Sequence, residues 1–172
     1  MRRLATITLV AATAACWAAA APVAAEEGLD LPLRKPGQWQ LTTAMDEGKG
    51  PRQSVLTMCI EAEMEKKTVL ASGAEHRANC STYEVKKVNG TTIVDASCAY
   101  DQRTVTSHTE MSGDFQTAFT VKIESTTSGA ARGQPVSVKR TILQEGKYVA
   151  QSCGDLQAGE AKDPEGRKVM VQ

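Results

Sequence analysis

Between residues 38 and 150 the chain alternates apolar and polar positions with a period of two, the pattern of half-buried β-strands. Turn-forming residues separate these runs, and successive runs of this kind pair as antiparallel hairpins. The pattern therefore predicts about seven or eight short strands. The runs cover 38–44, 53–58, 81–88, 91–100, 103–111, 115–125, 136–143 and 148–150.

One segment follows a different period. Within 60–72, Ile60, Met64 and Ala71 fall on one side at helical spacing, and Gly73 is a plausible C-terminal stop. With one apolar face per strand, the sheet must curl on itself or cover its concave side with this helix. The expected fold is mainly β: a curved antiparallel sheet or partly open barrel with one short helix.

The strongest turn signal is Asn89-Gly90, which predicts a two-residue type I′ hairpin. Its register places Ser81, and not Cys80, opposite Cys98, so the two cysteines are expected on opposite faces of the hairpin. The face that carries Cys98 also carries Tyr83, Val85, Val94, Ala96 and Tyr100.

The later turns are predicted from Gly and Asp positions. A three-residue loop over 112–114 would place Phe115 opposite Met111 in the next strand. A Gly-containing loop is expected over 127–135, and Glu145-Gly146 should turn the chain into a last short strand.

The first 25 residues have the features of a signal peptide. Two arginines precede an Ala-rich apolar run over 4–21, and small residues at 23–25 suit cleavage after Ala25. Lipid anchoring through Cys16 is disfavoured because Thr13 occupies the place where Leu is usual. The sequence therefore predicts export to the periplasm, with no transmembrane segment once the signal is removed.

The predicted organisation has four parts: the signal peptide 1–25, an extended acidic and Pro-rich lead-in 26–36, one disulfide-linked β domain 37–153, and a loosely ordered tail 154–172. Removal of the signal leaves 18 of the 20 basic residues against 20 acidic ones. These charges are scattered and aromatic residues make up 4% of the chain. The composition argues against nucleic-acid binding and against a polybasic membrane surface.

Four cysteines remain after the signal: Cys59, Cys80, Cys98 and Cys153. An even number in an oxidising compartment predicts a disulfide framework. No close C-x-x-C pair is present, which argues against a zinc site and a thioredoxin-type role. From the opposite faces of Cys80 and Cys98 we expect Cys59–Cys80 and Cys98–Cys153, with the remaining crossed pairing as the alternative.

No catalytic constellation is apparent. His108 is expected on the solvated face of a strand, and His76 in the loop after the helix, without an identifiable nucleophile beside either. Phosphate-binding loops and H-E-x-x-H are absent from the sequence. We therefore assign no catalytic residue, metal ligand or cofactor, and expect a protein that is not an enzyme.

Two resemblances bear on function. Gly37-Gln38-Trp39 resembles the start of lipocalins, whose barrels hold small apolar ligands, although a helix after the second strand does not fit their order of elements. A wider set of motifs looks like the bacterial exported proteins of domain of unknown function 3617. It consists of Leu33 to Trp39, Met58-Cys59, Cys80, Cys98, Ser112 to Phe115, Phe119-Thr120 and Cys153. That resemblance implies an envelope location and brings no catalytic residues; the segment after Cys153 departs from the expected ending.

Two functions fit these observations. The first is a non-catalytic periplasmic binding module of unknown specificity, for which a small apolar ligand is one candidate. The second is a structural protein of the cell envelope that docks a protein partner by strand pairing. Candidate ligand-facing or core residues are Trp39, Tyr83, Val94, Tyr100 and Phe119.

Overall fold

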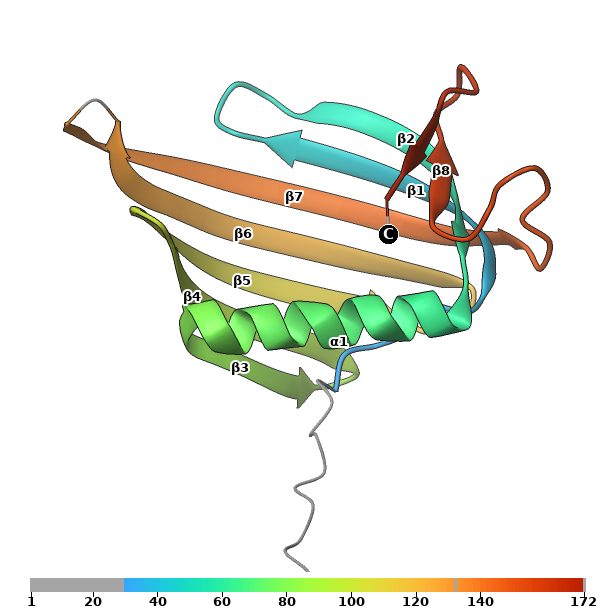
Figure 1. Ribbon diagram of the computed structural model, residues 1–172, viewed down its shortest axis with the longest axis horizontal. Helices are drawn as coiled ribbons and strands as arrows, with labels where there is room; N and C mark the ends of the chain where they lie inside the picture. The colour runs from blue at the N-terminus through green and yellow to red at the C-terminus, as the bar shows by residue number, and fades with distance from the viewer. Residues whose placement is uncertain (1–29, 132, 172) are drawn as a thin grey trace, which may run out of the picture.

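The computed structural model describes residues 30–131 and 133–171. The predicted signal peptide, with Cys16 and the cleavage site, lies outside these residues, as does the start of the lead-in. The described residues form one helix and nine strands (Figure 1). In chain order these are β1 (Gly37–Asp46), β2 (Arg52–Ile60), α1 (Ala62–Asn79), β3 (Cys80–Val88), β4 (Thr91–Tyr100), β5 (Arg103–Gly113), β6 (Ala118–Ala131), β7 (Gln134–Ala150), β8 (Glu160–Lys162) and β9 (Lys168–Met170).

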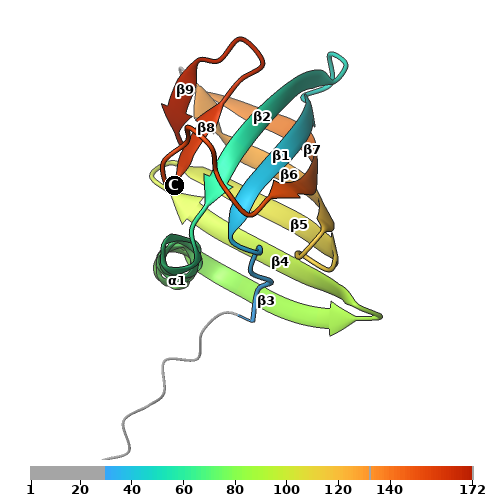
Figure 2. The same cartoon turned by 90° about the vertical axis from the view of Figure 1, so that its right-hand side faces the viewer.

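The strands form a single antiparallel sheet in the order β3-β4-β5-β6-β7-β1-β2-β8-β9. Strands β3 to β7 are a simple meander, and β1 pairs with β7, far along the chain. The sheet curls strongly without closing, and α1 lies across its concave side next to β3 and β4 (Figure 2). The predicted mainly β fold, a curved and partly open sheet with one helix, is confirmed.

The Asn89-Gly90 hairpin forms as predicted, with both residues at positive φ, 49° and 81°. At the start of β3, however, the register shifts between Cys80 and Thr82. This irregularity adds one residue to the strand, and it places Cys80 directly opposite Cys98.

The two disulfides are consequently Cys80–Cys98 and Cys59–Cys153. Both predicted pairings, Cys59–Cys80 with Cys98–Cys153 and the crossed alternative, are wrong. The prediction extended the turn register without interruption to residue 80, and one extra residue reverses the face on which a strand side chain lies.

Helix α1 is longer than predicted. It begins at Ala62, where the carboxylate of Glu61 accepts a hydrogen bond from the Met64 amide at 2.9 Å, and it continues past Gly73 to Asn79. Gly73 is buried within the helix and does not end it. His76 therefore belongs to the helix and not to a following loop.

Three predicted features of the later hairpins are also wrong. Met111 pairs with Val121, because β6 begins only at Ala118 and Phe115 lies in the preceding loop. The predicted loop over 127–135 is mostly strand, in β6 and β7. The expected turn at Glu145-Gly146 is the interior of β7.

Gly146 has a packing role in β7. A Cβ atom at this position would lie 2.1 Å from Cε1 of Phe119 on the neighbouring strand. The glycine therefore leaves room for a buried aromatic ring, so that a residue typical of turns sits within a straight strand.

Aromatic residues fill one end of the concave side, which we call the packed end. Trp39 is fully buried, and its ring centroid lies 5.4 Å from that of Phe119 and 5.6 Å from that of Tyr148. The buried cluster around them contains Leu41, Met58, Ile60, Phe115 and Ala161.

The lead-in closes the packed end. The Lys35 carbonyl accepts a hydrogen bond from the Trp39 indole at 2.7 Å, and the Lys35 amide donates to the Phe115 carbonyl at 2.8 Å. Arg34 donates to both carboxylate oxygens of buried Glu65, at 2.8 and 2.6 Å. This bidentate ion pair fixes the lead-in to helix α1.

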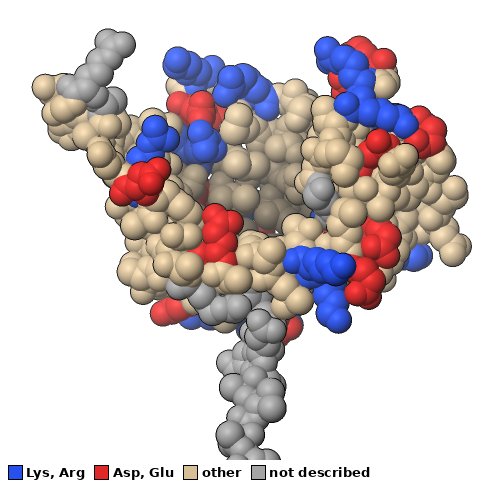
Figure 3. All heavy atoms as spheres, in the orientation of Figure 1, with Lys and Arg blue, Asp and Glu red and all other residues tan. Residues whose placement is uncertain are grey.

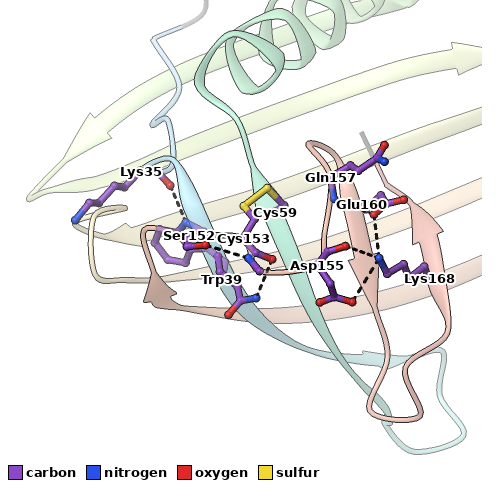
Figure 4. Close-up of a disulfide and its surroundings, with 11 residues drawn as sticks. Lys35, Trp39, Cys59, Ser152, Cys153, Asp155, Gln157, Glu160 and Lys168 are labelled. Atoms are coloured by element: carbon purple, nitrogen blue, oxygen red, sulfur yellow. Dashed lines mark hydrogen bonds and ion pairs between the residues drawn. A yellow bond between two sulfur atoms is a disulfide. The ribbon is translucent and has the colours of Figure 1, made fainter.

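The segment after Cys153, predicted as a loosely ordered tail, contains two short strands in the structure. Strand β8 pairs with β2, and β9 pairs with β8. Ala161 is fully buried in the core. The Cys59–Cys153 disulfide leads into this segment, where Lys168 contacts Asp155 and Glu160 (Figure 4). The tail thus extends the sheet beyond β2.

Candidate functional site

The concave face of the sheet is the candidate site. Because alternate residues of a strand share a face, the register carries the side of Trp39 across all the central strands. Moving from the packed end along β7, this side presents Tyr148, Gly146, Gln144, Ile142, Arg140, Val138 and Val136. The same face therefore changes from an aromatic side chain at the packed end to polar and aliphatic side chains farther along.

The end of this face away from Trp39, which we call the open end, is hollow. A cavity of about 550 Å³ lies there, with Val105, Val136 and Val138 in its walls. Val136 and Val138 are each 43% exposed. Figure 3 shows that the molecule is hollowed on the side facing the viewer, with a wall made mostly of uncharged residues. The volume of the cavity falls within the range of small-molecule sites.

Charged residues line one side of the hollow. Arg140 of β7 forms an ion pair with Glu47, in the loop between β1 and β2, through both its Nε and a terminal nitrogen. Arg52 also contacts Glu47, at 3.3 Å. The hydrogen bond and charge of Arg140 hold the pKa of Glu47 below its ordinary value. Glu47 is therefore a carboxylate already engaged by cations at the rim.

Arg103, at the start of β5, is a third cation beside the hollow. Its side-chain stem lies against β6, since a Cβ at Gly129 would be 3.2 Å from Arg103 Cγ. Among the described residues, no carboxylate forms an ion pair with Arg103, in contrast to Arg140. The open end thus combines aliphatic walls with a guanidinium group that has no acidic partner there.

The residues singled out from the sequence fall in different places. Trp39 and Phe119 are core residues of the packed end, and Val94 is buried under the sheet's concave side. Tyr83 stacks on His76, with ring centroids 4.7 Å apart. Of the five, only Tyr100 lines the cavity at the open end.

Sequence reasoning did not identify Arg103, Arg140, Val136 and Val138 as site residues. The alternation of Val136, Val138 and Arg140 was visible as one face of a strand. Nothing in that pattern says which end of the face the large aromatic residues fill.

A second group of residues has metal-ligand chemistry. His76 Nδ1 lies 3.8 Å from Cys80 Sγ, and ligand atoms of His76, Cys80 and Cys98 all lie within 4.8 Å of one another. Both sulfur atoms are engaged in a disulfide, and metals bind thiolates. While the disulfide is intact, the His76 imidazole is the one side chain of these three that can bind a metal ion.

His108 lies on the convex face. Its two ring nitrogens contact carboxylates, Asp95 at 2.6 Å and Glu110 at 3.3 Å. These hydrogen bonds raise the pKa of His108 because they favour the protonated ring. Among the described residues, the hydrogen-bond partners of the ring are these two acids, and no hydroxyl or thiol nucleophile is one of them.

The helix and the cysteines bear on where in the cell the protein is found. Within residues 30–131 and 133–171, no helix is both long and apolar enough to cross a membrane. Two disulfides join all four cysteines of this part of the chain, which is consistent with an oxidising compartment outside the cytoplasm.

Comparison with known proteins assigns a family without an activity. The family model described as "Protein of unknown function (DUF3617)" matches residues 34–153. This range extends from Arg34, which anchors the lead-in, to Cys153, which closes the long disulfide. No curated protein and no solved structure matches the chain. The protein belongs to the DUF3617 family.

Proposed function

We propose that this protein is a non-catalytic periplasmic binding module that holds a small apolar ligand at the open end of its concave face. The observation that carries the proposal is the hollow itself, walled by valines that remain 43% exposed. Aliphatic side chains held open to water gain free energy when a ligand covers them. The predicted signal peptide and the two disulfides support the periplasmic location.

The shape of the fold also supports the proposal. The packed end contains the aromatic cluster and the long disulfide, so the open end does not have to be filled for the sheet to be stable. A preformed concave surface of this kind is where small-molecule ligands bind most often.

A titration with the neutral fluorescent probe N-phenyl-1-naphthylamine tests this function. Val138→Asp places a charge in the wall, and we expect it to weaken probe binding about tenfold or more. Leu143→Asp is the matched control, because Leu143 lies on the convex side of the same strand and is 40% exposed. Its binding should equal that of the unmodified protein.

Two outcomes would contradict the proposal. One is an unmodified protein that shows no saturable binding of the probe. The other is equal weakening by Val138→Asp and Leu143→Asp, since that would separate binding from the concave face. Circular dichroism of both variants establishes that each remains folded.

A second candidate function, docking of an envelope protein, has one specific observation in its favour. The sheet ends in edge strand β9, where Val169 and Met170 are strongly exposed, and edge strands pair readily with other chains. Native mass spectrometry of protein purified gently from its periplasm distinguishes the two. A bound mass of a few hundred daltons favours the first function, and a bound polypeptide favours the second.

A further inference from the structure

We infer that the ligand of the open end is an anionic amphiphile, whose acidic head group binds Arg103 and whose apolar chain lies along Val105, Val136 and Val138. This inference rests on the proposed binding function and adds the chemical class of the ligand.

The charges around the hollow favour an anion. Its lining contains two arginines, Arg103 and Arg140, and a single acid, Glu47. Arg52 approaches the same acid from the β1–β2 hairpin, where Lys and Arg gather at the rim in Figure 3. Because the lining holds two guanidinium groups and one carboxylate, the hollow carries an excess of positive charge that attracts acidic ligands.

Arg103 is the cation best placed to receive a head group. Arg140 and Arg52 already bind Glu47, whereas Arg103 forms no ion pair with a described residue. A guanidinium presents several N–H donors in one plane, which matches the oxygens of a carboxylate or a phosphate. Gly129 lets the Arg103 stem lie against the sheet, which reduces the freedom lost when the head group binds.

The valines in the wall of the hollow favour an amphiphile over a small polar anion as the ligand. A purely polar anion would leave the aliphatic walls of the hollow in water, while an acyl or alkyl chain covers them. Each buried methylene group of such a chain contributes to binding. The charge of the head group and the burial of the chain therefore both strengthen the binding of one ligand at the same site.

Glu47 acts as an internal competitor in this arrangement. Its carboxylate occupies Arg140, the second cation of the lining. Removing the charge of Glu47 frees Arg140 and takes away a repulsive acid. Glu47→Gln should therefore strengthen the binding of anionic ligands and leave neutral ones unchanged.

The experiment measures displacement of N-phenyl-1-naphthylamine by twelve-carbon amphiphiles kept below their micelle concentrations. Dodecanoate and dodecyl phosphate supply the two anionic head groups, dodecyltrimethylammonium a cationic one, and dodecyl maltoside a neutral one. We expect the better anion to displace the probe at about tenfold lower concentration than the cation, because a charged hydrogen bond is worth roughly 1.5–3 kcal/mol. Which anion is preferred identifies the source as a fatty acid or a phosphate-bearing lipid.

Variants show which side chain causes the preference for anionic head groups. Arg103→Gln should remove most of the tenfold preference, and Glu47→Gln should increase it. Lys139→Gln is the matched control: it loses the same charge, but Lys139 lies on the convex face, beside Thr126 of β6. Between about 20 and about 500 mM NaCl the preference should shrink in the unmodified protein, since salt screens exposed charges.

The outcomes separate this inference from the proposed function. If the probe binds and all head groups displace it equally, the ligand class is wrong and the binding function stands. An unchanged preference in Arg103→Gln, or an equal loss in Lys139→Gln, also overturns the assignment to Arg103. If the probe does not bind at all, the proposed function itself fails.

Discussion

The packed end and the open end of the concave face are built on the same strands. At the packed end β6 and β7 present Phe119 and Tyr148 beneath the buried Trp39. At the open end the same two strands present Thr127 and Val138, which pair with each other. The β6–β7 ladder is continuous, but β1 accompanies β7 only from Thr141 to Ala150, so the open end lacks both the large aromatic side chains and this neighbouring strand. A single sheet can thus concentrate its stability at one end and keep the other end hollow.

One disulfide lies at the packed end and the other toward the open end. Cys59–Cys153 lies at the packed end and connects β2 to the segment that follows β7. Cys80–Cys98 lies toward the open end, where Cys98 pairs with Val105 of the cavity wall. Their sequence separations, 94 and 18 residues, are very different.

The largest expected effect comes from removing each disulfide. On the loop-closure model, Cys59→Ser with Cys153→Ser should lower the free energy of unfolding by about 5 kcal/mol, and Cys80→Ser with Cys98→Ser by about 3 kcal/mol. Urea denaturation of both double variants measures the difference. A larger loss at the open end would contradict the division of stability between the two ends.

Truncation of one side chain at each end comes next. Trp39→Ala should lower the free energy of unfolding by about 3–5 kcal/mol, because it leaves a large cavity in the core. Val138→Ala should cost less than about 1 kcal/mol, since the valine is only partly covered in the folded protein. Equal losses in thermal or urea unfolding would show that the open end also carries the core.

A smaller effect is expected from two strand glycines. Gly146→Ala places a Cβ within 2.1 Å of the Phe119 ring, and overpacking of this kind costs about 1–3 kcal/mol. The open-end counterpart, Gly129→Ala, places a Cβ 3.0 Å from the Gln102 carbonyl oxygen and 3.2 Å from Arg103 Cγ, which is a much milder crowding. Gly129→Ala should therefore cost less stability than Gly146→Ala, while it weakens the binding of anionic amphiphiles.

The smallest effect concerns pH at the packed end. Asp114 accepts hydrogen bonds from three backbone amides and from the Thr117 hydroxyl, in the loop that carries Phe115. These bonds hold the pKa of Asp114 far below its ordinary value near 3.8. The resulting stability is present above that ordinary value and is lost as the pH falls toward the lowered pKa.

Asp114→Asn tests this linkage. The variant should be less stable than the unmodified protein at pH 7, and the gap should narrow as the pH falls below about 4. Urea midpoints across this range provide the measurement. A gap that does not depend on pH would mean that the charge of Asp114 does not contribute.

Much of the fold was predictable because the period-two alternation is strong. The Asn89-Gly90 hairpin and the helix after β2 came from local signals that tertiary structure left intact. The predicted disulfide pairing is wrong because of a single irregularity between Cys80 and Thr82, which no residue type in the sequence indicates. Gly146 was interpreted as a turn, although it accommodates a ring from another strand.

The candidate site was harder to predict than the fold. The sequence predicts Trp39, Tyr100 and Phe119 together as ligand-facing or core residues, and it does not separate Tyr100, which lines the cavity, from the two that belong to the core. Alternation assigns side chains to a face but gives no position along it. That position is set by pairings such as β1 with β7, between residues about a hundred positions apart.

The pairing of β1 with β7 has a consequence for how the chain folds. Strands β3 to β7 pair with their sequence neighbours, so their hairpins can form as soon as each second strand is available. Strand β1 must instead wait for Lys147 and Tyr148, its partners near the far end of the chain. We therefore expect the β1–β2 hairpin, with Trp39 unburied, to dock only after the β3–β7 meander has formed. Trp39, which is fully buried in the finished protein, thus stays in water until the far end of the sheet has formed.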